Sequence, residues 1–329
     1  MKRKAFLSFT IVATFFFTAC KPEVKSGYVE VPTVTENALS SVYTLSPKHS
    51  KSKLYYEEAG QGETIILLHA KAVDCRMWDD VYFKLARKYH VIRYDMRGYG
   101  KSDSPEIGLG YLHADDLKNL MDALDIEQAN LVGLSMGGNA LADFIALYPE
   151  RVKTATLTSG AMTNYPDRSS APKWAVKIYN DTVFTVQCQE VKKNMEIGLA
   201  KLKDNRKKAM KSVSGKHYQS IKKDLNKMID DWQGWQLLHP ETDAFIGNQA
   251  DSLISKQKVH PPLLFIIGRY DYEDSKRSMQ KMASLCPGSR IKIMSEAGHF
   301  TAMECPKEFV EYLEDFIEKN SSGSRNVIR

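Results

Sequence analysis

Short apolar runs alternate with longer amphipathic segments along most of the chain. The runs at 65–68 and 263–267 contain no polar residue, which is typical of parallel strands covered on both faces. We therefore expect strands at 54–57, 64–69, 91–94, 130–134, 154–158, 263–267 and 291–294, and helices at 76–88, 114–124, 139–148, 275–285 and 307–318. This alternation predicts right-handed crossovers and an α/β fold with a doubly wound, mostly parallel sheet.

The alternation breaks once. Residues 163–259 hold helical patterns rich in lysine and tryptophan, without a convincing strand pattern. A helical insertion at this place predicts a lid on a core made of residues 51–162 and 260–319, with a polar tail at 320–329. Aromatic residues of the insertion either line an apolar pocket or pack the lid onto the core: Trp174, Tyr179, Trp232 and Trp235.

The first residues have the layout of an export signal. A basic leader, Lys2-Arg3-Lys4, precedes an apolar stretch at 5–17 that is too short to span a bilayer comfortably, and Cys20 follows two small residues. This arrangement resembles a bacterial lipoprotein signal, although Phe17 stands where an aliphatic residue is usual. The resemblance implies removal of residues 1–19, lipidation of Cys20, and a membrane-anchored protein facing the periplasm or the cell exterior. An ordinary secretory signal with a coincidental cysteine is the alternative.

After this signal, residues 20–50 are rich in Lys, Ser, Thr and Pro with little periodicity. They predict a tether that ends in an edge strand near residues 42–45. Four further cysteines follow. The pair that flanks the strand at 291–294 lies about 15 Å apart by strand geometry, beyond disulfide reach. We expect small buried thiols, and no His/Cys cluster has the spacing of metal ligands.

The positive charge is concentrated in one segment. The formal net charge is +6, and loss of residues 1–19, which hold three basic residues, would lower it to +3. Residues 186–231 contain twelve Lys or Arg against six Asp or Glu. Such a run is typical of a solvated helical face, while steering of anionic substrates or contact with anionic lipids are the alternatives. No nucleic-acid recognition motif accompanies the charge, so nucleic acid is not an expected partner.

The candidate chemistry starts at Gly133-Leu134-Ser135-Met136-Gly137, between a predicted strand and a predicted helix. A sharp turn there would lift the serine oxygen clear of the backbone, and the helix N-terminus would face charge developing near it. An activated serine needs a base and an acid that orients the base. Asp271 and His299 follow two later strands, where loops at the carboxyl ends meet. We predict Ser135 as nucleophile, His299 as base and Asp271 as acid, with Asp167 as the alternative acid.

The serine turn and the segments with Asp271 and His299 are accompanied by three further motifs: residues 67–69, the Asp-x-Arg-Gly turn at 95–98 and Glu304-x-Pro306. The order of all these motifs along the chain is that of α/β-hydrolase fold serine hydrolases. The chain resembles enol-lactonase-like and carboxylesterase-like members. The resemblance implies an oxyanion hole made by the backbone N–H groups of Met136 and Lys71. One position departs from the pattern, because Ala70 stands where glycine is usual. Its methyl group is costly only if the φ of that residue is positive.

The sequence therefore predicts a lipid-anchored serine hydrolase that cleaves a small carboxylic ester or lactone through an acyl-enzyme. We expect no metal, no organic cofactor and no obligate protein partner. Alternatives within the same fold are a hydrolase of carbon–carbon bonds, an aminopeptidase and a cofactor-free perhydrolase. A surface-anchored binding module without catalysis is the alternative of a different class.

Overall fold

The computed structural model describes residues 22–37, 50–107, 109–161, 173–239, 244–246 and 249–321, without the side chains of 173–184. The predicted signal with Cys20, the edge strand near 42–45, Asp167 and most of the polar tail lie outside these residues. One sheet of eight strands forms the centre, in the order β1-β2-β4-β3-β5-β6-β7-β8. The strands are β1 (Val24–Pro32), β2 (Lys51–Ala59), β3 (Thr64–Leu68), β4 (His90–Tyr94), β5 (Ala129–Leu134), β6 (Val152–Thr158), β7 (Leu263–Gly268) and β8 (Arg290–Met294).

The sheet is parallel from β4 to β8, and β1 and β2 add an antiparallel edge. Its middle strand, β3, pairs with both β4 and β5, and the side chains of Ile65, Ile66, Leu67 and Leu68 are fully buried. Such burial on both faces explains why the strand reads as an unbroken apolar run. The predicted α/β class with a doubly wound, mostly parallel sheet is confirmed.

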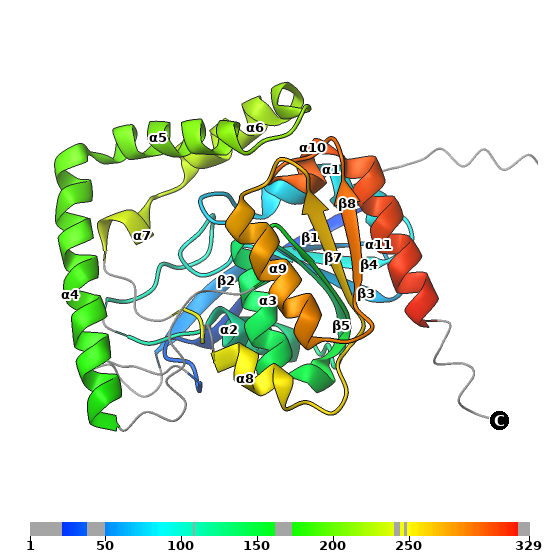
Figure 1. Ribbon diagram of the computed structural model, residues 1–329, viewed down its shortest axis with the longest axis horizontal. Coiled ribbons are helices and arrows are strands. Elements are labelled where there is room, and N and C mark those ends of the chain that lie inside the picture. Colours follow the sequence, from blue (N-terminus) through cyan, green and yellow to red (C-terminus); the bar gives the residue numbers. More distant parts are fainter. Residues whose placement is uncertain are drawn as a thin grey trace, which may run out of the picture.

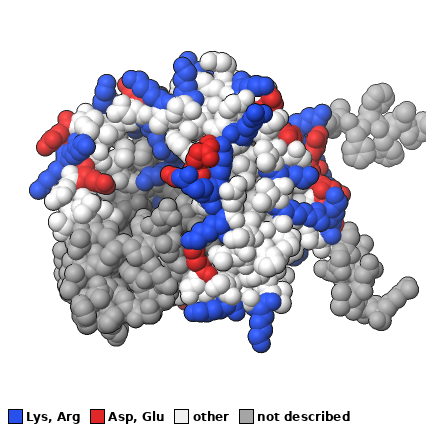
Figure 2. Space-filling view, in the orientation of Figure 1, with Lys and Arg blue, Asp and Glu red and all other residues white. Residues whose placement is uncertain are grey.

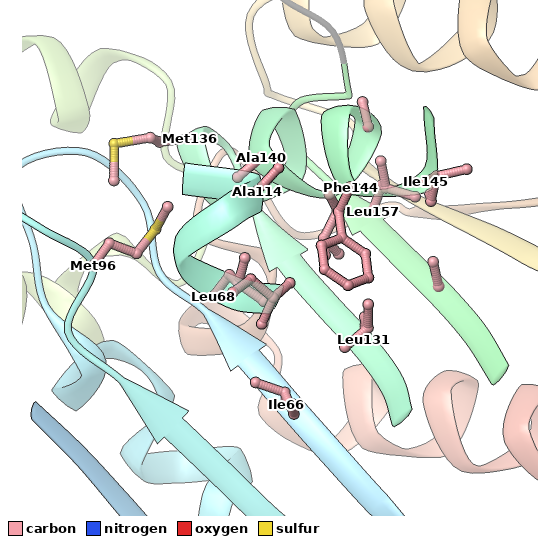
Figure 3. Close-up of a cluster of buried hydrophobic side chains, with 14 of the residues drawn as sticks. Ile66, Leu68, Met96, Ala114, Leu131, Met136, Ala140, Phe144, Ile145 and Leu157 are labelled. Carbon is pink, nitrogen blue, oxygen red and sulfur yellow. The ribbon is translucent and has the colours of Figure 1, made fainter. Parts of the chain in front are cut away.

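Helices cover both faces of the sheet (Figure 1). One face carries α2 (His113–Ala123), α3 (Met136–Leu147), α8 (Gln249–Ser255) and α9 (Glu273–Leu285), and the other carries α1 (Asp79–Leu85) and α11 (Pro306–Ser321). Figure 3 shows Phe144 and Ala140 of α3 above Leu68, Leu131 and Leu157 of three neighbouring strands. This packing fixes α3 directly after β5.

The segment between β6 and β7 is helical where it is described, as the sequence predicts. It contains α4 (Lys173–Ile197), α5 (Leu199–Ser212), α6 (Tyr218–Asp231) and α7 (Trp235–Leu238) before α8. Figure 1 shows α5 and α6 across the carboxyl end of the sheet. The helix α8 packs instead on α3 in the core layer, through Ala250 and Ile254. No helix of the described residues combines the length and apolarity that a membrane crossing requires.

The predicted tether at 20–50 is wrong over part of its length, because β1 forms a regular edge strand paired along β2. Arg97 explains why this segment is bound. Its fully buried guanidinium forms a two-point ion pair with Asp116 at 2.6 and 2.9 Å and donates to the carbonyl oxygens of Pro32 and Thr33, each at 2.8 Å. The sequence shows the arginine in its turn motif but not its partners, since Asp116 lies 19 residues away and the two carbonyl groups of β1 lie 64 and 65 residues away.

The four described cysteines are free thiols, as expected. Cys75 and Cys286 are buried, whereas Cys188 and Cys305 are partly exposed. The basic excess of the insertion lies at the surface, where Figure 2 shows more blue than red over the described part of α5 and α6. Most of these cations are exposed, and three of them pair with described acidic side chains: Lys207 with Asp230, Lys216 with Glu296 and Lys227 with Asp231. The segment is therefore mainly a solvated helical face.

Replacing Arg97 with methionine leaves Asp116 buried without its partner and removes the donors that hold the end of β1. We expect Arg97→Met to lower the free energy of unfolding by about 3–5 kcal/mol, measured by urea denaturation. The exposed Arg87 offers a matched control, since Arg87→Met should change stability by less than about 0.5 kcal/mol. Equal stability of the two variants would contradict this role of the buried ion pair.

Candidate active site

Ser135 occupies a strained turn between β5 and α3, with φ 56° and ψ −110°. Its N–H donates to the carbonyl oxygen of Thr158 at 2.8 Å, and its own carbonyl accepts from the N–H of Asn139 at 2.9 Å. Glycine is required beside it, because a Cβ at Gly137 would lie 2.4 Å from the carbonyl oxygen of Leu68. A serine in the left-handed region costs about 1–3 kcal/mol, and such strain is concentrated at functional sites. Ser135 is partly exposed.

His299 and Asp271 meet at the carboxyl ends of the two last strands. Nδ1 of His299 and Oδ1 of Asp271 are 2.6 Å apart, and both side chains are buried. The N–H of Tyr272 donates to the same oxygen at 2.7 Å, which holds the carboxylate in place. The imidazole is therefore fixed by its Nδ1, leaving Nε2 as the nitrogen available for proton transfer.

The end of β6 connects the serine turn to the histidine loop. Thr158 accepts from the Ser135 N–H, and the hydroxyl of the next residue, Ser159, donates to the carbonyl oxygen of His299 at 2.7 Å. The hydroxyls of Thr158 and Thr301 add a contact at 2.8 Å. No hydrogen bond joins Ser135 to His299 in the described part of the chain. Catalytic hydrogen bonds often tighten only when substrate is bound.

The loop after β3 supplies the second predicted oxyanion donor. Its histidine is locked, because Nε2 of His69 accepts from the Met96 N–H at 2.9 Å and Nδ1 bonds the carbonyl of Ala70 at 2.8 Å. Burial lowers the pKa of His69, so this imidazole is neutral. Ala70 is not among the described residues with positive φ; that conformation falls on Ala72, with φ 69°. The methyl group of Ala70 therefore adds no backbone strain to the loop.

The predicted oxyanion donors, the N–H groups of Met136 and Lys71, follow the ends of the paired strands β5 and β3. Met136 is the first residue of α3, where N–H groups have no partner within the helix. The Lys71 N–H makes no hydrogen bond to any described residue. The positive end of the α3 dipole adds to the field at this point. The two donors and Ser135 come from neighbouring strands, since β3 pairs with β5.

The helical insertion is bonded directly to the histidine loop. The His299 N–H donates to the carbonyl of Val213 at 2.8 Å. The buried carboxylate of Glu304 accepts from Gly298 at 3.2 Å, from Phe300 at 3.3 Å and also from Gly215 in the turn between α5 and α6. Burial raises the pKa of Glu304, and these donors oppose the rise. Glu304 thus holds the base loop and the insertion together.

Glu304 belongs to a motif of the sequence, but the motif alone predicts no role for it. Its spacing to His299 is visible, whereas its contact with Gly215 joins residues 89 positions apart. Aromatic contacts were equally hidden: Tyr272 packs edge-on against His299, with ring centroids 5.3 Å apart. Trp232 is buried and stacks on Tyr99 at 6.3 Å, so it packs the insertion onto the core. The structure does not describe the side chains of Trp174 and Tyr179.

The described residues contain one group with metal-ligand proximity: Asp74, Cys75 and Asp95. Both oxygens of Asp95 accept backbone N–H groups, from Cys75 at 2.9 Å and from Lys101 at 2.8 Å. Burial also raises the pKa of the Cys75 thiol, which keeps it protonated. These contacts build the Asp-x-Arg-Gly turn, and a neutral thiol is a poor metal ligand.

A family profile described as alpha/beta hydrolase fold matches residues 63–306. The chain is 38% identical over 126 residues to a 2-hydroxy-6-oxo-6-phenylhexa-2,4-dienoate hydrolase of Comamonas testosteroni, a stretch of 36% of this chain. The match spans 44% of that relative's length.

Two solved structures share the fold. An esterase of Thermogutta terrifontis has a TM-score of 0.65 and 20% identity, covering 87% of this chain and 99% of the other. The enol-lactonase of Burkholderia xenovorans LB400 has a TM-score of 0.60 and 22% identity, covering 81% and 97%.

We predict that Glu304→Gln loosens the histidine loop, because an amide NH₂ replaces one acceptor that faces backbone N–H groups. The loss should lower the free energy of unfolding by about 1–3 kcal/mol. Amide hydrogen exchange should become faster at residues 213–216 and 296–300. Glu311→Gln, on the exposed side of α11, makes the same chemical change as a control. Unaltered exchange in both segments would contradict the clamp.

Proposed function

The chain belongs to the alpha/beta hydrolase fold family, and we propose that it is a serine hydrolase that cleaves a small carboxylic ester or lactone through an acyl-enzyme. It is an enzyme by its membership and its hydrolase relatives. One observation carries the proposal. The strained Ser135 and the buried His299–Asp271 pair are attached to the same end of β6.

In this mechanism Oγ of Ser135 forms a bond to the carbonyl carbon, and His299 takes the hydroxyl proton. The electron pair of the C=O bond moves to oxygen, where the N–H groups of Met136 and Lys71 stabilise the negative charge. The ester C–O bond then breaks, and the leaving oxygen takes the proton from His299. Asp271 orients the imidazole and stabilises its charged form. Water repeats the sequence on the acyl-enzyme and restores Ser135.

A carbon–carbon bond hydrolase is the second candidate, supported by the hydrolase of Comamonas testosteroni that matches part of the core. An aminopeptidase and a cofactor-free perhydrolase would use a similar triad. The two solved structures of the same fold support the first candidate, since one is an esterase and the other an enol-lactonase. A binding module without catalysis is disfavoured, because it would have no use for a strained serine beside a buried histidine–carboxylate pair.

We also propose that the protein is exported and anchored to a bacterial membrane through lipid on Cys20. The support is the basic leader, the apolar stretch and the small residues before the cysteine. The nucleophile would then work on the outer side of the cytoplasmic membrane. Substrates would have to be present in the periplasm or outside the cell.

The triad is tested by fluorophosphonate labelling and by release of p-nitrophenol from a short-chain ester. We expect labelling of the wild type and none of Ser135→Ala. Ester turnover by His299→Ala should fall by about 10⁴-fold or more, because the serine loses its base. Both variants should keep the wild-type far-UV circular dichroism.

The exposed Ser284 on α9 provides the control, since Ser284→Ala should keep full labelling and turnover. A folded wild-type protein that stays unlabelled would sink the catalytic proposal. Undiminished turnover by His299→Ala would place the base elsewhere. Esters of several acyl lengths, lactones, amides and a vinylogous 1,5-diketone, assayed on the same sample, separate the candidate reactions.

The anchor is tested by mass spectrometry of the mature N-terminus from a bacterial membrane fraction. We expect a chain that begins at a lipid-modified Cys20. Cys20→Ser should abolish the lipid and shift the protein out of the membrane fraction, whereas the matched variant Cys188→Ser should leave both unchanged. A mature chain with unmodified Cys20 would overturn the anchor and leave the catalytic proposal untouched.

A further inference from the structure

The helix α5 carries one cation that differs from its neighbours. Lys203 donates to the carbonyl oxygen of Asp230 at 2.6 Å, and Lys207 pairs with the side chain of the same residue. Arg206, one residue before Lys207, turns instead toward the core. Its Nη2 lies 3.4 Å from the carbonyl oxygen of Lys71, near the limit for a hydrogen bond. Arg206 is therefore the cation through which α5 contacts the predicted oxyanion loop.

The charge of Arg206 is not neutralised. It forms no ion pair with an acidic side chain in the part of the chain that the structure describes. Its Nε is inaccessible to solvent and has no hydrogen-bond partner among the described residues. Burial lowers the pKa of the guanidinium, and the groups that oppose the fall are the phenols of Tyr272 and Tyr99. Arg206 is partly exposed as a whole residue. An arginine stays charged in proteins, and a charge partly removed from water is ordinarily paired.

Both of these tyrosines pack against histidines of the candidate site. Tyr272 packs edge-on against His299, and Tyr99 packs edge-on against His69, with ring centroids 5.2 Å apart. Lys71 supplies the predicted oxyanion donor. Arg206 thus lies on the insertion side of the site, between the loop that would hold the oxyanion and the loop that holds the base. A substrate bound to Ser135 would lie next to it.

We propose that Arg206 binds a carboxylate group of the substrate, so that the enzyme acts on anionic esters or lactones such as monoesters of dicarboxylic acids. The inference rests on the proposed function and deepens it. A planar guanidinium matches the two oxygens of a carboxylate. The carboxylate of the substrate would supply the negative charge that no described side chain provides to Arg206. This carboxylate would be separated from the scissile carbonyl by a few bonds.

Alternative uses of Arg206 fit the contacts less well. A structural arginine would have its donors filled, as Arg97 does with one carboxylate and two carbonyl oxygens. An arginine of the solvated face would extend into water, as the exposed Lys201 and Lys208 of the same helix do. The basic surface of α5 and α6 around it (Figure 2) favours the approach of an anionic substrate.

The test compares two esters with the same leaving group and the same chain length. Mono(4-nitrophenyl) adipate carries a free carboxylate, and its methyl ester is neutral. We expect wild-type kcat/KM to favour the anionic ester by about 10-fold or more after subtraction of the spontaneous reaction. Arg206→Met should lower kcat/KM for the anionic ester by about 10- to 100-fold, mainly through KM, and change the neutral ester by less than about twofold. Arg206→Lys should recover part of the loss.

Lys201→Met removes one positive charge from the exposed side of the same helix, so it controls for long-range electrostatics. Its preference for the anionic ester should stay within about twofold of wild type. Equal losses on both esters in Arg206→Met would show a structural role and overturn the proposal. A wild-type enzyme that hydrolyses the neutral ester as well as the anionic one would overturn it too.

Binding to the Ser135→Ala variant makes the test independent of turnover. We expect monomethyl adipate to bind more tightly than dimethyl adipate by calorimetry, and Arg206→Met in this background to abolish the difference. Equal binding of the two compounds would refute the carboxylate site even if the protein is an active esterase. If the wild type is not labelled by fluorophosphonate but the Ser135→Ala variant still binds the anionic compound more tightly, only the serine hydrolase proposal is refuted.

Discussion

The site depends on a close approach of backbone segments at the carboxyl ends of β3, β5 and β6. A Cβ at Gly137 would lie 2.4 Å from the carbonyl oxygen of Leu68, and one at Gly138 would lie 2.1 Å from that of Gly160. These contacts bring α3 onto the sheet within one residue of Ser135. The serine turn is strained because the helix begins this close. With larger side chains at these two positions, the nucleophile, the helix N-terminus and the loop after β3 would separate.

The histidine loop extends the same assembly to a segment far from the sheet. Val213 accepts the His299 N–H, and Glu304 bonds both Gly298 and the turn that follows α5. The end of the insertion near the base is therefore part of the active-site framework rather than a separate cover. Any outward movement of α5 and α6 would break hydrogen bonds to the loop that carries the base. Movement is easier at segments that lack such bonds.

The sequence predicted the elements that follow local rules. Buried parallel strands read as apolar runs, and the serine turn shows its glycines, so the α/β fold and the position of Ser135 could be inferred. The ends of two later strands then indicated Asp271 and His299. In the structure, Nδ1 of His299 lies 2.6 Å from Oδ1 of Asp271. The edge strand at 24–32 could not be found this way. Its pattern is polar and weak, and it is bound through Arg97 to residues that no local pattern connects.

The same reason hides the contacts made by the insertion. The sequence predicts a helical insertion, but it gives Arg206, Lys207 and Lys208 the same appearance, a run of three cations. Only the packing shows that Arg206 lies against the loop of Lys71. Likewise, the turn at Gly215 has no sequence signal that relates it to Glu304.

These placements separate two properties of the enzyme. The groups proposed to break bonds follow the ends of sheet strands and match the family pattern, so they constrain the substrate little beyond a reactive carbonyl. In the proposal for Arg206, the groups that face the remainder of the substrate come from α5 and from Tyr272, which packs against His299. Because Glu304 bonds both the turn after α5 and the histidine loop, a change in the insertion that moves this turn also alters the position of His299. Selection for a new substrate should therefore act through side chains of α5 that leave residues 213–216 in place.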